Sequence, residues 1–294
     1  MIECFELALP DGIRLSVRAC GPAQAPRVVF LHGFPEGAFI WDETMLALSG
    51  RFRCLAPNLR GYAPSSAPQA VDAYRARQLT ADIAVMIVQT GPGPVAALVG
   101  HDWGGAVSWN LAVQRPELMR QLVVINSPHP GTFLRELQLN PAQQQASAYM
   151  NYFCRPDAEA QLAAQEHARL LALFRNAQGQ MPDWLDEGLQ QRYLALWQHG
   201  LTGLLNYYRA SPMRPPTSSD AAVLGLSFAP ELVTVKLPTL VIWGEEDRAL
   251  LPSLLNGLGQ FVPLLDVRRV PGASHWIVHE RPDLVLQYLG EVLR

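Results

Sequence analysis

Short apolar runs alternate with helical patterns along the first 130 residues, and this alternation restricts the fold more than any other feature of the sequence. Four runs are predicted to be strands: RVVFL (27–31), which is expected to be buried, RCLAP (53–57), PVAALVG (94–100) and QLVVIN (121–126). Helical patterns occupy the stretches between them, for example residues 41–48 and 79–91. The sequence therefore predicts the α/β class, with a mostly parallel central sheet and helices on both faces.

The alternation is interrupted once. The first twenty residues are predicted to form two strands around the turn Pro10-Asp11-Gly12. From about residue 131 to 213 only helical segments rich in Gln, Ala and Leu occur. Strands return at 237–244 and 265–270, and residues 279–294 are predicted to form a closing helix. We expect one core domain, 1–130 and 214–294, with a helical cap, 131–213, inserted in it.

Composition and charge narrow the functional classes. The chain of 294 residues is 49% hydrophobic and 17% charged, as expected for a globular protein rather than a disordered one. Its net charge is −3 and its basic residues are scattered, so we expect neither nucleic acid nor a membrane as a partner. Glu3 and Glu6 stand where a signal peptide carries positive charge, and no apolar run reaches membrane-spanning length. A cytoplasmic location is expected.

The four cysteines, Cys4, Cys20, Cys54 and Cys154, are widely spaced and form no C-x-x-C pair. Neither a zinc site nor dithiol chemistry is indicated, and free thiols are the default expectation. The predicted N-terminal turn makes Cys4 and Cys20 candidates for cross-strand neighbours, but the sequence does not establish a disulfide between them.

The segment GHDWG (100–104) lies between a predicted strand and a predicted helix. It matches the G-x-S-x-G nucleophile elbow of hydrolases, with Asp102 in place of the serine. The turn is so tight that β-carbons at the glycine positions would collide with the neighbouring strand or helix, and the central side chain is held above the sheet in a strained conformation. An aspartate before a helix also suits a simple N-cap, so the neighbouring segments decide between the two roles.

Hydrolases of this kind order their groups along the chain as nucleophile, acid and histidine. Asp247 follows the strand at 237–244, and His275 lies in a loop after the next strand. Glu245 and Glu246 compete with Asp247 on sequence grounds alone. We predict that Asp102, Asp247 and His275 form a catalytic triad.

Two further positions bear on this site. The segment HGFP (32–35) follows a strand and has the form of an oxyanion loop, in which the amides of Phe34 and Trp103 would hold a developing negative charge. A Gly-Phe-Pro sequence also suits an ordinary tight turn. Asn126 ends another strand, at a place where an acid is sometimes found, but it has no carboxylate.

An aspartate at the nucleophile position selects the class of reaction. Serine must lose a proton before it attacks, whereas aspartate is already ionised at neutral pH. A carboxylate suits displacement at an sp³ carbon that bears a leaving group, namely an epoxide oxygen or a halide. The product is an alkyl ester of Asp102, and His275, oriented by Asp247, would activate water to attack its carbonyl carbon.

The sequence resembles the epoxide hydrolases of the α/β-hydrolase fold. The resemblance covers nearly the whole chain and rests on five segments that occur in the family's order: HGFPE (32–36), NLRGY (58–62), GHDWGG (100–105), NSPHP (126–130) and SHW (274–276). It implies the α/β-hydrolase fold and the conversion of an epoxide to a vicinal diol without a cofactor. Haloalkane dehalogenases share the core motifs and are the leading alternative.

The resemblance also implies two cap tyrosines that protonate the departing epoxide oxygen, which leaves as a strongly basic alkoxide. By match of the surrounding residues we assign these roles to Tyr149 and Tyr208, with Tyr152 and Tyr207 as the alternatives. Cap tyrosines are often only packing residues. The candidates for the lining of a substrate pocket are Trp103, Tyr152, Tyr207 and His129.

The choice between the alternatives depends on a few residues. Trp103 would suit a halide donor, but Phe34 stands where many haloalkane dehalogenases place an asparagine. Relatives that cleave fluoroacetate carry arginines where this chain has Trp103 and Ala106. His275 and His279 are four residues apart, but no third ligand accompanies them, so no metal is expected. A hydrolase-fold protein that only binds a small molecule is the alternative from another class.

The helical insertion is rich in aromatic residues, so we expect a small hydrophobic substrate. A homodimer is possible, and the sequence leaves the oligomeric state open.

Overall fold

The computed structural model describes residues 1–293, in which eight strands form one sheet in the order β1-β2-β4-β3-β5-β6-β7-β8. The strands are β1 (Glu3–Ala8), β2 (Arg14–Cys20), β3 (Arg27–Leu31), β4 (Arg53–Pro57), β5 (Ala97–His101), β6 (Leu122–Ile125), β7 (Thr239–Gly244) and β8 (Leu265–Val270). β2 pairs antiparallel with β1 and β4, and every pair from β4 to β8 is parallel. The predicted α/β class with a mostly parallel sheet is confirmed.

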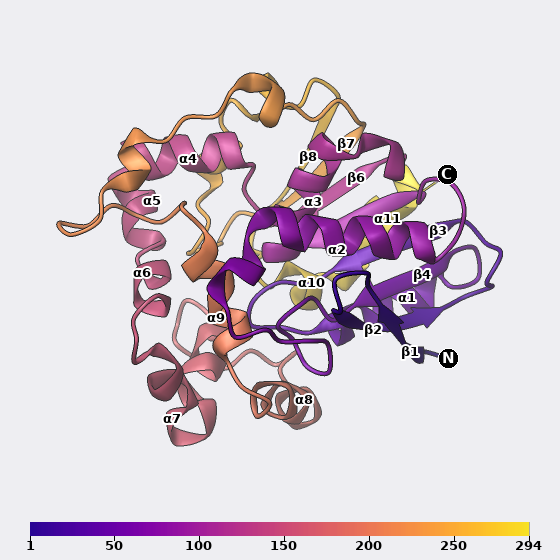
Figure 1. Ribbon diagram of the computed structural model, residues 1–294, viewed down its shortest axis with the longest axis horizontal. Coiled ribbons are helices and arrows are strands. Elements are labelled where there is room, and N and C mark those ends of the chain that lie inside the picture. The colour runs from indigo at the N-terminus through magenta and orange to yellow at the C-terminus, as the bar shows by residue number, and fades with distance from the viewer. Residues whose placement is uncertain (294) are drawn as a thin grey trace.

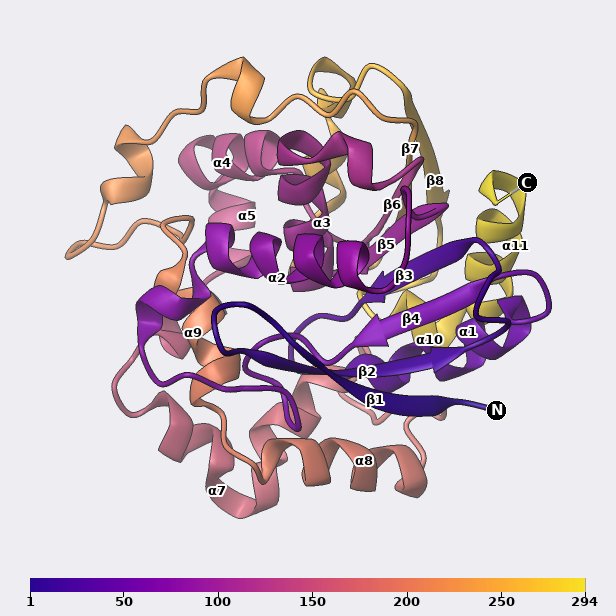
Figure 2. The same ribbon diagram turned by 45° about the vertical axis from the view of Figure 1, so that its right-hand side comes forward.

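Helices cover both faces of the sheet. Figures 1 and 2 show α2 (Ala76–Gln89) and α3 (Trp103–Gln114) on one face, and α1 (Asp42–Leu48) and α11 (Pro282–Val292) on the other. Because both faces are covered, β3 and β5 are buried along their whole length. Short 3₁₀ helices span Ala38–Trp41, Val71–Tyr74, Pro116–Leu118, Ala172–Phe174, Ala222–Gly225, Pro230–Leu232, Pro252–Leu255 and Leu258–Gln260.

Between β6 and β7 the chain leaves the sheet and forms a run of helices. These are α4 (Pro130–Leu139), α5 (Pro141–Ala146), α6 (Tyr149–Phe153), α7 (Ala158–Leu171), α8 (Glu187–Trp197) and α9 (Thr202–Ala210). Within this stretch, all of which the structure describes, no strand forms. α7 is interrupted at residues 164–167, and residues 165–167 have positive φ. Helices α6 to α9 gather beside the carboxyl ends of the parallel strands (Figure 1), so the segment proposed as a cap lies next to the loops that follow those strands.

The C-terminal helix differs from its prediction. The chain forms a short helix, α10 (Ile277–Glu280), and then α11, with Arg281 between them in a non-helical conformation (φ −136°, ψ 53°). Pro282 accounts for this break, because the residue before a proline is kept out of the helical region. Arg294, the end of the predicted helix, lies outside the described residues.

The register of the N-terminal strands corrects the expectation for Cys4 and Cys20. Cys4 lies opposite Arg18 on β2, and Cys20 lies opposite Cys54 on β4. Cys4 and Cys20 are therefore not cross-strand neighbours, and all four cysteines are free thiols. Among residues 1–293, no helix combines the length and the apolar character that crossing a membrane requires.

Candidate active site

Asp102 occupies the junction between β5 and α3 in a strained conformation. Its φ of 51° and ψ of −122° are unfavourable for a residue with a side chain. The chain packs closely here, since a β-carbon on Gly104 would collide with the carbonyl of Leu31 on β3. Glycine at this position lets α3 begin directly against the sheet. The junction thus has the tight geometry that the GHDWG segment predicts.

The two carboxylate oxygens of Asp102 have different surroundings. Oδ1 accepts a hydrogen bond from the Phe34 amide at 2.7 Å, whereas Oδ2 lies 3.6 Å from Nε2 of His275. The Ser127 hydroxyl donates to the backbone carbonyl of Asp102 at 2.6 Å. Of the two predicted oxyanion donors, the Phe34 amide bonds to the carboxylate, and within residues 1–293 the Trp103 amide does not. The side chain is 12% exposed, so it is open to a ligand from one side.

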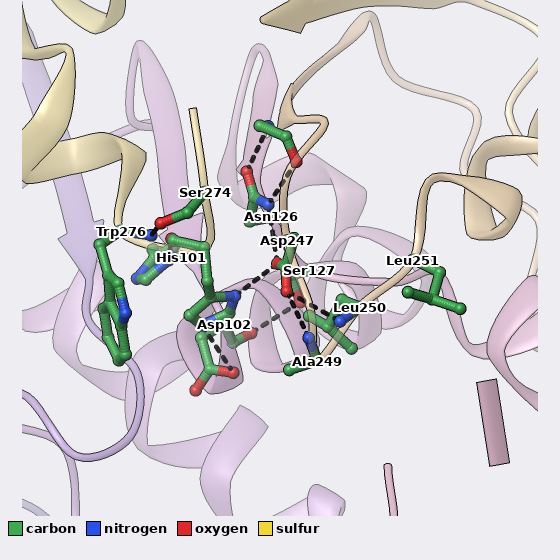
Figure 3. Close-up of polar contacts among 12 residues, drawn as sticks. His101, Asp102, Asn126, Ser127, Asp247, Ala249, Leu250, Leu251, Ser274 and Trp276 are labelled. Atoms are coloured by element: carbon green, nitrogen blue, oxygen red, sulfur yellow. Dashed lines mark hydrogen bonds and ion pairs between the residues drawn. The ribbon is translucent and has the colours of Figure 1, made fainter. Parts of the chain in front are cut away.

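Asp247 is the acid that orients His275. Its Oδ2 lies 2.6 Å from Nδ1 of His275, and its Oδ1 accepts from the amides of Ala249 and Leu250 at 2.8 Å each (Figure 3). Burial raises the pKa of the Asp247 carboxyl, but the imidazole and these hydrogen bonds reverse the effect and hold the pKa below its usual value.

Glu245 and Glu246, the competing acids, are directed elsewhere. Glu245 pairs with Arg269 at 3.2 Å, and Glu246 is exposed. Asp247 is therefore the carboxylate of this loop that contacts the imidazole.

The pKa of His275 is raised. Burial lowers it, but the negative charges of Asp247, Asp102 and Glu36 outweigh burial and bring the pKa to about 9. The imidazole is therefore protonated at neutral pH.

Asn126 belongs to the site, although no role was predicted for it from the sequence because it has no carboxylate. Its Nδ2 donates to Oδ2 of Asp247 at 2.8 Å, and its Oδ1 accepts from the amide of Gly244 at 2.8 Å (Figure 3). The residue has a positive φ of 37° at the end of β6. Because β6 and β7 are neighbours, a residue just after β6 lies beside the loop that carries Asp247. The strand order, had it been known, would have indicated this contact.

A second buried group lies behind the imidazole, and sequence reasoning did not assemble it. The fully buried Glu36 carboxylate accepts from the hydroxyl of Tyr193 at 2.7 Å and lies 2.7 Å from Nε2 of His279 and 3.3 Å from Nδ1 of His101. Nε2 of His101 in turn lies 2.9 Å from the backbone carbonyl of His275. Burial raises the pKa of the Glu36 carboxyl, but His279 and His101 reverse this and leave it well below its usual value.

Two cavities meet at Asp102, Tyr149 and Tyr208. One, of about 470 Å³, has mainly apolar walls that include Trp103, Ala106, Phe133, Met150, Tyr207 and Leu250. The other, of about 340 Å³, lies on the side of His275, and its walls include Phe34, Arg175, Gln178, Arg248, Ala177 and Trp276. A ligand in contact with Asp102 would therefore have an apolar cavity on one side and a more polar one on the other.

Tyr149 and Tyr208 face the nucleophile from the helical insertion. Their ring centres are 6.0 Å apart, and both residues line both cavities. Burial, followed by nearby charges that include Asp102, raises the pKa of each phenol, so both stay protonated.

The remaining predicted residues have other contacts. The hydroxyl of Tyr207 donates to the Arg60 carbonyl at 2.7 Å, although its ring lines the apolar cavity. The hydroxyl of Tyr152 accepts from Arg169 at 2.8 Å. His129 is buried, and both of its ring nitrogens bond to the backbone. Tyr152 and His129 line neither cavity at Asp102, so their assignment to the pocket was wrong. Both are engaged in packing and hydrogen bonds outside it.

Known proteins are similar to this chain along nearly its whole length. A model of the alpha/beta hydrolase fold family matches residues 26–282. The AB hydrolase superfamily protein YfhM of Bacillus subtilis (strain 168) is 36% identical over 97% of this chain and 96% of the relative. Epoxide hydrolase 3 of Mus musculus is 32% identical over 97% of this chain and 75% of the relative.

Solved structures of epoxide hydrolases are also similar to this chain, both in fold and in sequence. A structure reported for novel epoxide hydrolases from metagenomes of hot environments is similar with a TM-score of 0.89 and 36% identity, over 100% of this chain and 99% of that one. The Bacillus megaterium epoxide hydrolase in complex with an inhibitor is similar with a TM-score of 0.89 and 32% identity, over 98% and 99% of the two chains.

Proposed function

The chain belongs to the α/β-hydrolase fold family, and from this premise we propose that it is an epoxide hydrolase that converts an epoxide to a vicinal diol through an ester on Asp102. One observation carries the proposal. A carboxylate occupies the nucleophile position, with one oxygen held by an amide and the other 3.6 Å from an imidazole, in a cavity lined by two protonated phenols.

In the first step, Oδ2 of Asp102 attacks a carbon of the epoxide ring and the bond from that carbon to the ring oxygen breaks. The ring oxygen takes a proton from Tyr149 or Tyr208. The raised pKa of each phenol supports this role, because a group must be protonated to act as a general acid. The product is a hydroxyalkyl ester of Asp102.

Before the second step, the protonated His275 gives its proton to the tyrosinate that the first step left, so that the imidazole can act as a base. In the second step, His275 takes a proton from water, and the water oxygen attacks Cγ of Asp102. Negative charge develops on Oδ1, where the Phe34 amide donates, and we assign the second donor to the Trp103 amide at the start of α3. The bond between Cγ and Oδ2 then breaks, and the departing alkoxide takes the proton of the hydroxyl group that water supplied, so the diol leaves with Oδ2 and the carboxylate is restored. The imidazole keeps the proton that it took from water and so returns to its protonated resting state, and the net change is the addition of one water to the epoxide.

The charge on the side chain of Asp102 determines the stage of the reaction at which His275 can act as a base. In the free enzyme this charge helps to raise the pKa of the imidazole to about 9. Formation of the neutral ester removes the charge, so the pKa of His275 falls at the stage where the residue must act as a base.

A trapping experiment tests the function. After brief incubation of a His275→Gln variant with styrene oxide, mass spectrometry should detect one substrate mass added to the peptide that contains Asp102. The matched Asp102→Asn variant should gain no mass. Absence of both an adduct and diol formation across a panel of aryl, alkyl and terpene oxides would contradict the proposal.

The alternatives have their own readouts. Release of bromide from 1,2-dibromoethane, without turnover of any oxide, would identify a haloalkane dehalogenase. Silence in both assays, together with binding of small apolar compounds, would favour a binding protein.

We also propose a small hydrophobic substrate and a cytoplasmic location. The apolar walls of the cavity beside Trp103 and Phe133 support the first, and the four free thiols support a reducing compartment. Cell fractionation of the full chain tests the location. The homodimer stays a prediction, which light scattering on the purified protein tests.

A further inference from the structure

Helix α8 of the insertion contacts the back of the loop that supplies the Phe34 amide. This loop, residues 32–36, is called the oxyanion loop here. The indole N–H of Trp197 donates to the carbonyl of Pro35 at 2.7 Å, and the hydroxyl of Tyr193 donates to Oε1 of Glu36 at 2.7 Å. Both donors are buried, and neither residue lines the cavities at Asp102. They therefore act on the loop and not on a ligand.

The two contacts fall on the residues that directly follow Phe34. The amide of Glu36 donates to the carbonyl of Gly33 at 3.0 Å and closes the turn that carries the Phe34 amide. The amide of Phe34 then points at Oδ1 of Asp102. A displacement of Pro35 or Glu36 changes the position of this amide, because one short turn contains all three residues.

Helix α8 is anchored independently of these two bonds. Arg192 pairs with Asp42 of α1 at 2.7 Å and lies over the ring of Phe39 at 4.4 Å. The ring of Tyr193 also packs against the ring of Phe39, with the ring centres 5.1 Å apart. Loss of one polar group therefore leaves the helix docked, so each hydrogen bond can be tested alone.

The two steps of the proposed reaction differ in what they require of the Phe34 amide. During ester formation negative charge leaves the carboxylate, so a donor on Oδ1 gains no strength in the transition state. During hydrolysis negative charge arrives on Oδ1, so the same donor becomes stronger. Accurate placement of the amide accelerates the second step and not the first.

We propose that Trp197 and Tyr193 are positioning residues for ester hydrolysis, which they promote by holding the oxyanion loop from the insertion side. The inference rests on the proposed function and adds to it that α8 is part of the hydrolytic machinery. The inference gives a role to the hydrogen bonds that Tyr193 and Trp197 donate to the oxyanion loop. Trp184 packs on Phe174 as Tyr193 does, but its indole N–H has no partner within residues 1–293.

Transient kinetics separates the two steps. Rapid-quench mass spectrometry with styrene oxide gives the rate constants for ester formation and for ester hydrolysis in the wild type and in Trp197→Phe and Tyr193→Phe variants. We expect hydrolysis to fall about tenfold, less than the loss of a whole oxyanion donor costs, and ester formation to stay within about twofold. The ester should accumulate in the steady state. The matched control is Trp184→Phe, which removes an indole N–H that has no hydrogen-bond partner in the part of the chain that the structure describes.

Three outcomes would overturn the inference. The first is an equal fall of the rate constants for ester formation and ester hydrolysis in the Trp197→Phe variant. The second is ester hydrolysis at the wild-type rate in both the Trp197→Phe and the Tyr193→Phe variants. The third is a fall of ester hydrolysis in the Trp184→Phe control as large as that in these two variants. Thermal unfolding of all three variants identifies a variant that fails to fold, and Tyr193→Phe, which loses only one oxygen, then carries the test. If the wild type itself forms no adduct on Asp102, the proposed function fails. If the adduct forms and the variants hydrolyse it at the wild-type rate, this inference alone fails.

Discussion

At the scale of single residues, the two carboxylate oxygens of Asp102 have different hydrogen-bonding environments. Oδ1 of Asp102 bonds to an amide and Oδ2 faces the imidazole, so one carboxylate offers both a nucleophile and a future oxyanion. The contact of Asp102 and Asp247 with His275 was accessible from the sequence, because each of these residues follows a recognisable strand. Asn126 was not, since its contact with Asp247 depends on the pairing of β6 with β7.

The paired phenols give the first prediction. A Tyr149→Phe, Tyr208→Phe double variant should lose epoxide opening by roughly a hundredfold or more, the range of general acid catalysis. Rapid-quench measurement of ester formation checks this. The control is Tyr152→Phe, whose hydroxyl contacts only the exposed side of the insertion, and it should keep the wild-type rate. Wild-type ester formation in the double variant would remove the tyrosines from the mechanism.

The imidazole gives a prediction about pH and stability. The pKa of His275 is about 9 in the folded protein against an ordinary value of 6.5, so the protonated form favours folding. This contribution, at most about 3 kcal/mol, is fully present below pH 6.5 and is lost as the pH rises through 9. Chemical denaturation between pH 6 and about 9.5 should therefore show a steeper loss of stability in the wild type than in the His275→Gln variant. Parallel curves would contradict the assignment.

At the scale of elements, prediction from the sequence was accurate where the residue pattern of a short run is typical of a strand. The runs RVVFL, RCLAP and LDVRRV coincide with β3, β4 and β8 residue by residue. It failed where one proline or one register decides, as in the break before Pro282 and the partner of Cys20. The interruption of α7 at 164–167 has no signal in the sequence that we can identify.

The junction of β5 and α3 allows a prediction at this scale. A Gly104→Ala variant should lose roughly 1–3 kcal/mol of stability, because its methyl group would collide with the Leu31 carbonyl on β3. Urea denaturation measures the loss. Gly290→Ala in α11 is the matched control: no atom of residues 1–293 lies within 4 Å of its added methyl group, so the variant should be neutral or up to about 1 kcal/mol more stable. Equal stability of the two variants would show that the junction tolerates a β-carbon.

At the scale of the whole molecule, the site exists only where the insertion meets the sheet. His101, His279 and Tyr193 come from three distant segments and converge on the carboxylate of Glu36. No local sequence pattern predicts that these distant segments lie together. The residues that line the cavities could not be predicted either, because they depend on how the helices pack. This is why the pocket residues Tyr152 and His129 were misassigned while the triad order was recognised.

The two cavities give a prediction at this scale. Ala106 is half-buried in the wall of the apolar cavity, so an Ala106→Phe variant should fill that cavity. We expect kcat/KM for a bulky aryl oxide to fall about tenfold or more and that for propylene oxide to change little, because only the larger substrate needs the space. Ala177→Phe makes the same substitution in the wall of the other cavity. An equal effect of the two variants on the aryl oxide would contradict the assignment of the apolar cavity to the substrate.

The unlike walls on the two sides of Asp102 also have a stereochemical consequence. We expect an epoxide with one apolar and one polar substituent to bind in a single orientation. This orientation decides which ring carbon Asp102 attacks, and the configuration of that carbon is inverted. Mirror-image substrates offer different carbons, or different faces, to the same oxygen. We therefore expect the enzyme to convert the two enantiomers of such an epoxide at different rates and to enrich one of them from a racemic mixture.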